Sequence, residues 1–556
     1  MKIKFLILLS LTLPFAFNAE GGSATWNLNP TSGDWNTATN WTPNTVPNGP
    51  SDTATFSLST QTGISLSAIT TVNGIVFDPG ASAFTITASP DFPLTIGNAG
   101  VTNNSGMSQN FVVANRSNLF WTGNATAGSG TIYTSTGRTQ TYGLQSVIFF
   151  DESSAGDGTF INEPGLANGE GGGYTQFYDH STAGTGTFFN QGSAVAGAGS
   201  GYIEFGVPSP PGSTAGNGKF TLNGGTGSFA FGGQIDFYCY TTAGNATFTI
   251  NGGTVADALP AIINFFCDAT ADNATLVANG GLNGAAGGAI HFAYQALGSS
   301  ARVELFGNSS LDISLHDAPG MSIGSVEGDG LVFLGGNDLA VGGNGLDMRF
   351  SGVIQDGGSN GGTGGSLTKA GSGKLSLAGA STYMGGTTIE GGKLVVNNMS
   401  GSGTGSGTVR VNAGVISGRG TIAGAVIVGT GSGSGAGLAP GRRGRKTDTL
   451  TIQNTLTFQL DSTFTFELKA TSGAADKVVA NGVTINSGAL FSFIGLGSGT
   501  LTVGTVFTAI SNASAAPISG TFANLADGAT ITVGSNTFQA NYEGGDGNDL
   551  TLTVVP

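Results

Sequence analysis

Charged side chains are scarce in this sequence. Only 9% of its 556 residues are Asp, Glu, Lys or Arg, and the 33 acidic residues outnumber the 18 basic ones, so the formal net charge is −15. A nucleic-acid partner needs a basic surface to neutralise its phosphates, and this balance argues against one. The one basic run is Arg442-Arg443-Gly444-Arg445-Lys446. We interpret it as a solvated turn; contact with an anionic polysaccharide and a protease site are the alternatives.

Long apolar stretches are missing after the first residues. The N-terminus, MKIKFLILLSLTLPFAFNA, joins Lys2 and Lys4 to an apolar run over 5–17, which is typical of a secretory signal and short for a spanning helix. Residues 1–24 are the predicted signal peptide, with cleavage after Ala19 as the alternative. We expect an exported protein that is extracellular or lies at the cell surface, where association with the outer membrane is one alternative. The mature chain is expected to have no transmembrane segment.

Glycine is the residue in excess, with 98 copies. Such a chain must turn often, but 35 Phe and 39% hydrophobic residues supply more apolar surface than disordered segments usually carry. A folded, turn-rich protein is therefore expected.

Two phrases repeat through the middle of the chain with one period. The phrase AGxGxF and its variants begin at intervals of 28, 28, 32, 28 and 28 residues, at Ala127, Ala155, Ala183, Ala215, Ala243 and Ala271. A second phrase, apolar-x-Phe with Thr175 once in the apolar place, ends at Phe149, Phe177, Phe205, Phe237, Phe265 and Phe292. The units show strand patterns and no sustained helical one. A unit this short buries its apolar face only by stacking on its neighbours, which predicts an all-β, right-handed parallel β-helix with rungs of about 28 residues.

The repeat gives two further features a place. The interval of 32 falls at 207–211, a Pro-rich insertion that is either a contact loop or a tolerated bulge. Cys239 and Cys267 occupy one position of adjacent rungs, where a disulfide is conceivable in an exported protein. Asp151 and Asp179 hold the same position in earlier rungs, which favours a tolerant turn site over a dedicated staple. Both alternatives stay open.

Residues of catalytic or metal-binding type form no convincing pattern. His180, His291 and His316 lack metal-ligand spacing. The sequence Gly357-x-Ser359-x-Gly361 matches a nucleophile elbow but lacks its strand-turn-helix context. Asp34, Asp52, Asp151 and Asp179 are the carboxylates to inspect, and we interpret them as solvated turn residues. No catalytic, metal or cofactor site is expected.

Two other stretches invite a functional interpretation. GGDGNDLTL, 544–552, begins like a calcium-binding nonapeptide, but its nearest relative, GGNGLDMRF at Gly342, is remote. We expect a tight turn there before the final strand. In SLTKAGSGKLSLAGASTYMGGTTIEGGKLVVNN, 366–398, short alternating runs between Gly corners predict one turn of the solenoid. Thr387, Thr388 and Tyr383 within it are assigned to structure rather than to a ligand.

Residues 350–440 also carry a family resemblance. FSGVIQDGG, the stretch just quoted, GTIAGAVIV and GLAPG resemble the autotransporter-associated beta strand repeat and its partner segment. The resemblance implies an exported, passenger-like β-helix linked to adhesion or surface structure. An autotransporter would continue into a barrel, and none is recognisable after Leu450.

The predicted organisation follows the composition along the chain. The divisions are a signal peptide over 1–24, an N-terminal β-rich cap with the first rungs over 25–113, the 28-residue repeats over 114–348, the family repeat over 349–440 and a C-terminal β segment over 441–556. The final segment opens with apolar residues alternating along one face, at Leu450, Ile452, Leu456, Phe458, Leu460, Phe464, Phe466 and Leu468.

Three functions fit this description. The first is a non-enzymatic exported protein for adhesion, matrix or surface structure, whose partners would be polysaccharides or other cell-surface components. The alternatives are a polysaccharide-active enzyme, a lyase or hydrolase, and a carbohydrate-binding scaffold. Carboxylates and basic residues converging in one groove would favour the enzyme, and exposed aromatic rows would favour the scaffold. The sequence indicates no oligomeric state.

Overall fold

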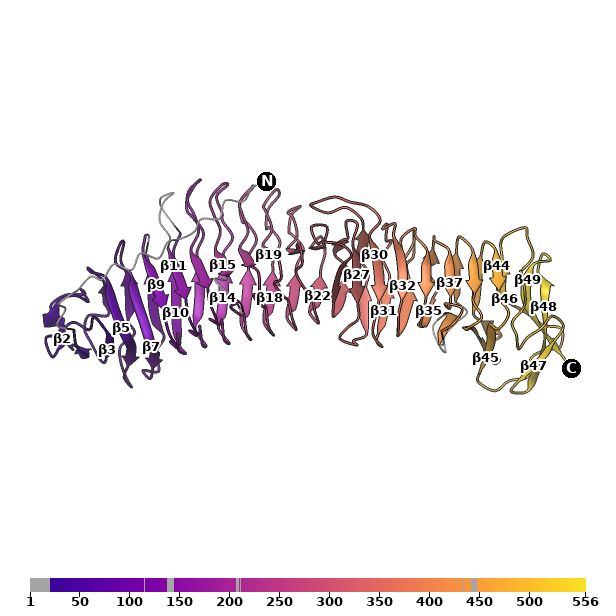
Figure 1. The fold of residues 1–556 in the computed structure, drawn as a ribbon, viewed down its shortest axis with the longest axis horizontal. Coiled ribbons are helices and arrows are strands. Elements are labelled where there is room, and N and C mark those ends of the chain that lie inside the picture. The colour runs from indigo at the N-terminus through magenta and orange to yellow at the C-terminus, as the bar shows by residue number, and fades with distance from the viewer. Residues whose placement is uncertain are drawn as a thin grey trace.

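The protein is an elongated stack of short strands that coil around one long axis (Figure 1). The computed structural model describes residues 21–114, 116–137, 145–206, 210, 212–433, 435–441 and 448–556. Most of the predicted signal peptide, most of the Pro-rich insertion and the basic run 442–446 lie outside these residues. The only helix among the described residues is a 3₁₀ turn, η1 (Ala38–Asn40), so none is long and apolar enough to cross a membrane.

The described residues form four sheets that run along the molecule. The first has 15 strands, parallel from β1 onward. In sequence order they are β1 (Ala24–Trp26), β2 (Trp41–Thr42), β3 (Gly49–Phe56), β5 (Thr70–Phe77), β7 (Leu94–Asn103), β9 (Asn118–Trp121), β11 (Ser146–Phe149), β13 (Tyr174–Phe177), β15 (Tyr202–Phe205), β17 (Gln234–Phe237), β19 (Ile262–Phe265), β21 (Ala289–Phe292), β23 (Ser310–Asp312), β26 (Leu331–Phe333) and β29 (Val353–Gln355).

The second sheet follows the same axis over almost the whole chain. It contains β4 (Gly63–Ser65), β6 (Thr85–Ala88), β8 (Gln109–Val113), β10 (Thr131–Ser135), β12 (Thr159–Asn162), β14 (Thr187–Asn190), β16 (Lys219–Leu222), β18 (Thr247–Ile250), β20 (Thr275–Ala278), β22 (Arg302–Leu305), β25 (Ser325–Gly328), β28 (Met348–Phe350), β31 (Lys374–Leu377), β33 (Lys393–Val396), β35 (Gly414–Gly418), β38 (Ala436–Pro440), β41 (Ser462–Lys469), β42 (Ala474–Ala475) and β45 (Leu490–Leu496).

The third and fourth sheets belong to the C-terminal half. The third contains β24 (Gly320–Ile323), β27 (Asp338–Val341), β30 (Ser366–Lys369), β32 (Gly386–Ile389), β34 (Val409–Val411), β37 (Val426–Val428), β40 (Leu456–Phe458) and β44 (Val483–Ile485). The fourth contains β36 (Thr421–Ile422), β39 (Thr449–Ile452), β43 (Lys477–Ala480), β46 (Val506–Asn512), β47 (Thr530–Val533), β48 (Asn536–Gly544) and β49 (Asp549–Val555).

The predicted parallel β-helix is confirmed, and both repeated phrases mark equivalent positions of its rungs. The Phe residues of the apolar-x-Phe phrase stack in register inside the first sheet, with ring centroids 4.5–4.8 Å apart from Phe149 to Phe292. A second ladder, from Tyr133 to Phe248, lies inside the second sheet and meets the first ladder edge to face. Stacked rings and parallel ladders together make one continuous core along the axis.

The AGxGxF phrase forms a corner of each rung. Its alanine is fully buried, and its glycine takes a left-handed conformation, with φ of 55° at Gly156. A Cβ on Gly156 would lie 2.6 Å from Oγ1 of Thr126 in the rung before, so glycine permits both the turn and the close stacking. The residue before each alanine bridges to the next rung, as Ser154 does to Thr182. From Gly320 onward, strands of the third sheet take the place of these single bridges.

Rungs become shorter where the family resemblance lies. Ser366 pairs with Gly386 and Lys374 pairs with Lys393, so these rungs hold about 20 residues. The stretch 366–398 therefore contains one full turn and most of the next, rather than the single turn predicted. Its predicted inward residues are buried, at Leu367, Leu375, Leu377, Tyr383, Ile389, Leu394 and Val396.

Both ends of the core are closed. At the N-terminal end Trp26, Trp35 and Trp41 pack around Phe56, with ring centroids 5.0–6.1 Å apart. At the other end β46, β49, β48 and β47 pair antiparallel and cover the last rungs. In the alternating segment from Leu450 the apolar side chains are buried as expected, except Leu460, which lies in the turn before β41 and is 51% exposed.

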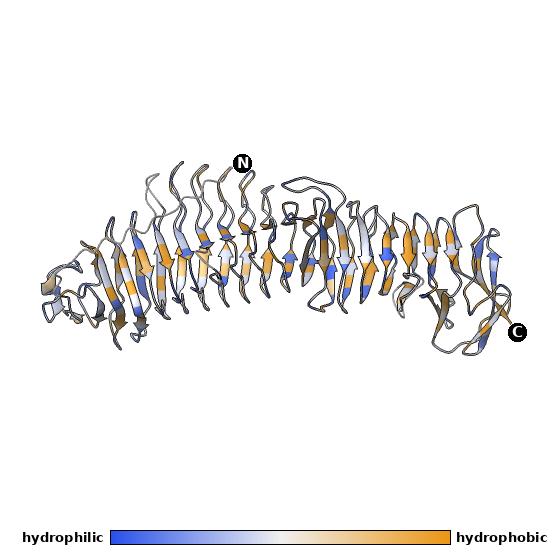
Figure 2. Cartoon of the chain, in the orientation of Figure 1, coloured by the Kyte–Doolittle hydropathy of each residue, from blue (hydrophilic) through white to orange (hydrophobic). Residues whose placement is uncertain are grey.

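Outer and inner faces differ sharply in polarity. Blue and orange residues alternate along the strands in Figure 2, as a two-faced strand requires.

Cys239 and Cys267 form a disulfide between adjacent rungs, with their Cα atoms 4.9 Å apart, which settles the question that the sequence left open.

Candidate functional site

The carboxylates selected from the sequence are held by the backbone. Asp151 accepts a hydrogen bond from the backbone N–H of Gly123 (2.8 Å), and Asp179 accepts one from the N–H of Asp151 (3.1 Å). Each therefore ties the turn of one rung to the rung before it. This stacking of Asp151 on Asp179 matches the prediction, and its contacts are structural.

The two N-terminal carboxylates are separate from this pair. Asp34 closes a local turn by accepting from the N–H of Asn36 (3.2 Å) and the hydroxyl of Thr37 (2.7 Å). Asp52 is buried and accepts from the N–H of Asn48 (3.2 Å). The structure thus does not bring the four candidate aspartates together.

Ser359 and the histidines do not form a nucleophilic triad. The hydroxyl of Ser359 donates to Oδ2 of Asp312 (2.8 Å), not to an imidazole. His180 lies beside Glu152, and the ring nitrogens of His316 face the carbonyl oxygens of Ala296 and Asp317. In a nucleophile elbow the serine hydroxyl donates its hydrogen bond to the general base that activates it. Here the hydroxyl of Ser359 donates to the carboxylate of Asp312 instead.

GGDGNDLTL forms the tight turn that was predicted. It joins β48 to β49, with Gly544 opposite Asp549 and positive φ at Gly545 and Gly547. The carboxylate of Asp549 accepts from the backbone N–H of Asn512 (2.8 Å) and so ties the hairpin to β46.

The most elaborate group of polar side chains lies on the outer face of the first sheet, over β11 to β21. Three rows of outward residues run along the axis there, and we call them together the tyrosine–carboxylate face. The central row is Ile148, Gln176, Glu204, Asp236, Asn264 and His291, each paired in register with the next. The flanking rows are Ser146, Tyr174, Tyr202, Gln234, Ile262 and Ala289 on one side, and Phe150, Tyr178, Gly206, Tyr238, Phe266 and Ala293 on the other.

Asp236 is the hub of this face. Its carboxylate accepts hydrogen bonds from the hydroxyls of Tyr202 (2.8 Å) and Tyr238 (3.3 Å). The side-chain amides of Gln234 (2.9 and 3.0 Å) and Asn264 (2.7 Å) also donate to it. Donors from three adjacent strands thus surround one carboxylate that is only 5% exposed, as buried charges require.

Glu204 is the register partner of Asp236 and has fewer donors. It accepts from the hydroxyl of Tyr178 (3.1 Å) and the amide of Gln176 (3.3 Å). Tyr178 reaches it across Gly206, where a Cβ would lie 2.6 Å from Cε1 of the tyrosine ring. Glycine at this one position therefore lets the ring lean over the neighbouring strand.

Burial dominates the electrostatics of the face. It raises the pKa of Glu204, and the adjacent charge of Asp236 adds to that shift. It also raises the pKa of Tyr202 strongly, again with help from Asp236. The pKa of Tyr238 rises to about 12 because of burial and the charges of Asp236 and Glu204. Both tyrosines are therefore neutral hydrogen-bond donors at any physiological pH.

The central row continues to His291 and the neighbouring Asp312. Nδ1 of His291 lies 3.0 Å from Oδ1 of Asn264. Burial lowers the pKa of His291, although the charges of Asp312 and Asp236 act in the opposite direction. In Asp312, hydrogen bonds from Ser359 and Ser314 outweigh burial and lower the pKa of the carboxyl. The row thus ends in a neutral imidazole beside a carboxylate.

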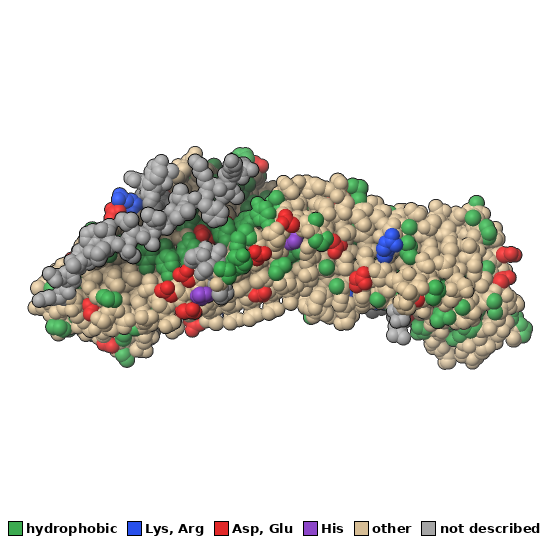
Figure 3. All heavy atoms as spheres, viewed as in Figure 1, with side chains coloured by type: hydrophobic (Ala, Val, Ile, Leu, Met, Phe, Trp, Pro, Cys, Tyr) green, Lys and Arg blue, Asp and Glu red, His purple; other side chains and the backbone are tan. Residues whose placement is uncertain are grey.

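Aromatic side chains flank the row on both sides. Tyr174 and Tyr202 meet edge to face with centroids 5.1 Å apart, and Phe150 stacks on Tyr178 at 5.6 Å. Tyr238 stacks on Phe266 at 5.5 Å. Figure 3 shows hydrophobic and acidic side chains side by side over the rungs of the N-terminal half, on the face in view. The face therefore combines ring surfaces with carboxylate and amide groups.

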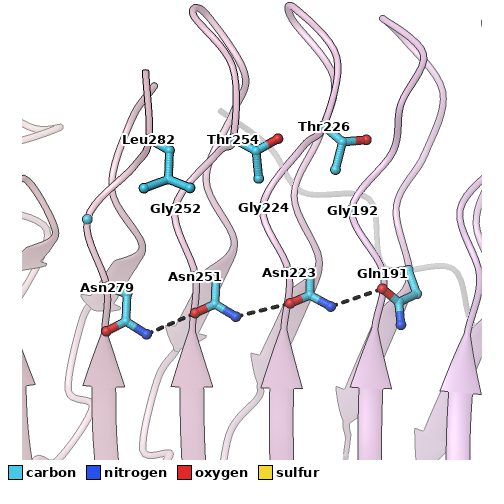
Figure 4. Close-up of a pocket in the computed structure, with 11 residues that line it drawn as sticks. Gln191, Gly192, Asn223, Gly224, Thr226, Asn251, Gly252, Thr254, Asn279 and Leu282 are labelled. Carbon is cyan, nitrogen blue, oxygen red and sulfur yellow. Dashed lines mark hydrogen bonds between the residues drawn. The ribbon is translucent and has the colours of Figure 1, made fainter. Parts of the chain in front are cut away.

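A second polar feature is a groove of about 480 Å³ at the ends of β14, β16, β18 and β20. Asn223, Asn251 and Asn279 line it as a ladder that begins at Gln191 (Figure 4). The side-chain amide of each asparagine donates to the side-chain oxygen of the equivalent residue in the preceding rung, at 2.9–3.0 Å. Glycines 192, 224, 252 and 280 follow these residues, and a Cβ on any of the first three would lie 2.0–2.4 Å from the backbone of the next rung. It contains no charged side chain among its lining residues.

The tyrosine–carboxylate face was not predicted as a site from the sequence, although His291 was considered. A signal was present: the middle residue of the apolar-x-Phe phrase is Gln176, Glu204, Asp236, Asn264 and His291 in turn. An outward position that is polar in five successive rungs predicts a polar row. The hydrogen bonds from flanking tyrosines are not visible in that pattern.

One comparison with known proteins, that with family models, agrees with the resemblance stated above. The model of the passenger-associated-transport-repeat matches residues 367–396, inside the predicted repeat region. No curated protein sequence matches the chain significantly. Among solved structures the chain is similar to the Haemophilus influenzae Hap adhesin, at 12% identity and a TM-score of 0.24. That match covers 91% of this chain and 64% of the Hap chain, so this chain spans less than two thirds of its length.

Proposed function

We propose that this chain is an exported, non-enzymatic β-helix of the cell surface or the medium, with a role in adhesion or matrix structure. The match to a passenger-associated repeat supports a passenger-like protein sent to the cell surface. The observation that carries the proposal is the tyrosine–carboxylate face, because it presents ring surfaces and polar groups outward from a rigid, continuous core. Such a face suits adhesion to a surface.

The contacts of the carboxylates support a binding role over turnover. Asp151 and Asp179 each accept a hydrogen bond from a backbone N–H of a neighbouring rung, and both oxygens of Asp236 accept from side chains. A carboxylate that transfers protons or attacks substrate must direct an oxygen to the reacting atom.

One observation favours the second candidate, a polysaccharide-active enzyme. Glu204 and Asp236 are adjacent in register, and burial raises the pKa of Glu204. A pair of carboxyl groups in unlike environments is the usual arrangement of a glycoside hydrolase.

The test measures attachment and turnover together. The purified full chain is offered to intact bacterial cells and to a panel of neutral and acidic polysaccharides, and both retained protein and newly released reducing ends are measured. We expect attachment without product. Product that disappears in Glu204→Gln would replace this proposal with the hydrolase.

A further inference from the structure

We propose that the tyrosine–carboxylate face binds a neutral polysaccharide laid along the helix axis, whose sugar rings stack on the tyrosines and whose hydroxyls hydrogen-bond to Gln176 and Glu204. This inference rests on the proposed function and names the ligand class of the same face.

The length of the face indicates an extended ligand. Its aromatic residues are distributed from the rung of Phe150 to that of Phe266, which are four rung steps apart. At about 4.8 Å for each step, the ring surfaces span about 20 Å. This is the scale of an oligomer rather than of a single sugar.

An unsatisfied acceptor points to a ligand with hydroxyl donors. Gln176 is 7% exposed, and its Oε1 has no hydrogen-bond partner among the described residues. Its Nε2 is already used, since it donates to Tyr178 and Glu204. A buried acceptor without a donor is unfavourable. Because this oxygen is itself buried, a sugar hydroxyl would supply the missing donor only once the Gln176 amide turns toward the surface.

Charge selects the class of polysaccharide. The three rows of the face contain no Lys or Arg, and the central row holds Glu204 and Asp236 side by side. A uronic or sulfated chain would meet these carboxylates without a compensating cation. Asp236 already takes donors from four side chains, so its charge is offset inside the protein. A cationic ligand therefore gains little there, and a neutral chain is favoured.

The rings supply the rest of the recognition. Tyr174, Tyr202, Tyr178 and Tyr238 flank the central row on both sides, half-buried and hydrogen-bonded or packed against neighbouring rings. Side chains fixed in this way lose little conformational entropy on binding. Apolar ring faces with a few fixed polar groups are the usual composition of a ligand site.

The test uses soluble neutral glucan and galactomannan, with polygalacturonate as the anionic probe, in affinity electrophoresis and calorimetry of the full chain. We expect a neutral polymer to bind and polygalacturonate not to bind. Tyr202→Ala and Gln176→Leu should each weaken binding about tenfold, since each removes one ring or one acceptor. The matched control is Tyr294→Ala, because Tyr294 is 49% exposed and lies outside the three rows; its affinity should stay within about twofold of the wild type.

Three results would overturn the inference: binding of polygalacturonate alone, binding of a neutral polymer that Tyr202→Ala and Gln176→Leu leave unchanged, or no binding of any probe. Far-UV circular dichroism and melting curves identify a variant that has lost the fold. Should Tyr202→Ala prove unstable, Gly206→Ser tests the same site, because the Cβ of the new serine would displace the Tyr178 ring. Attachment to cells without binding of the neutral probes would refute the ligand class and leave the adhesive role standing.

Discussion

Replacing Asp236 by asparagine tests whether one carboxylate organises the outer face of the first sheet. The change keeps the size of the side chain and removes its charge. Four side chains donate to Asp236, three from strands β15, β17 and β19 and one from Tyr238, which directly follows β17. In Asp236→Asn the amide nitrogen replaces one acceptor oxygen, so some of these donors must rotate or lose their acceptor.

The expected cost follows from the number of donors. A hydrogen bond to a charged group contributes about 1.5–3 kcal/mol and a neutral one about 1 kcal/mol. Replacing charge-assisted by neutral contacts removes about 0.5–2 kcal/mol at each donor, so four donors predict a loss of about 2–8 kcal/mol in the free energy of unfolding. The loss should be local, because each rung of a solenoid depends mainly on its neighbours.

Denaturant unfolding and amide hydrogen exchange measure this loss. Exchange should accelerate in β15, β17 and β19 and stay unchanged in the C-terminal cap. The control is Asp257→Asn, since Asp257 is exposed on the loop between β18 and β19, with a φ of 61° that asparagine also accepts. Equal stability of the two variants within about 0.5 kcal/mol would refute the role of Asp236. A double-mutant cycle with Tyr202→Phe should show a coupling of about 1 kcal/mol between the two side chains.

Three further predictions concern the core and the C-terminal rungs. Phe205→Ala removes a ring stacked between Phe177 and Phe237 and should cost about 3–5 kcal/mol in denaturant unfolding; a loss below 1 kcal/mol would mean that the ladder is not continuous. Lys369→Met should cost about 1–3 kcal/mol in the same assay, because the buried ammonium donates to the carbonyl oxygens of Ala370, Gly371 and Gly391, and an unchanged stability would contradict this. Burial raises the pKa of Asp476 to about 7, so the folded state keeps a proton that the unfolded chain loses near pH 4. Stability should therefore fall between about pH 4 and pH 7 in the wild type relative to Asp476→Asn, and parallel melting temperatures across that range would refute the shift.

The rung period was readable because equivalent positions repeat. Ala155, Ala183 and the Phe residues of the second phrase recur at a fixed interval, and parallel stacking puts residues at that interval on top of one another. The inward position of the phenylalanines follows from strand alternation. The shorter rungs of the family repeat were harder to predict, since their length is not constant, at 20 residues from Ser366 to Gly386 and 22 from Thr387 to Val409, and Gly pairs mark several corners alike.

The candidate site was less predictable than the core. Glu204 and Asp236 stand in equivalent places of the repeat, so their adjacency could be inferred from spacing. The direction in which Tyr178 leans could not, because it depends on the missing Cβ at Gly206 in the next rung. The turn capping by Asp151 and Asp179 likewise depends on where the carboxylates point.

The sequence by itself determined the stack: its period, its inward ladder of rings and its small, glycine-rich corners, since each of these is repeated in every unit and needs no knowledge of distant contacts. The tertiary structure alone decided that Cys239 joins Cys267 and that Tyr202 and Tyr238 both donate to Asp236. Outward side chains have several rotamers open to them, and only packing against the neighbouring rungs selects one.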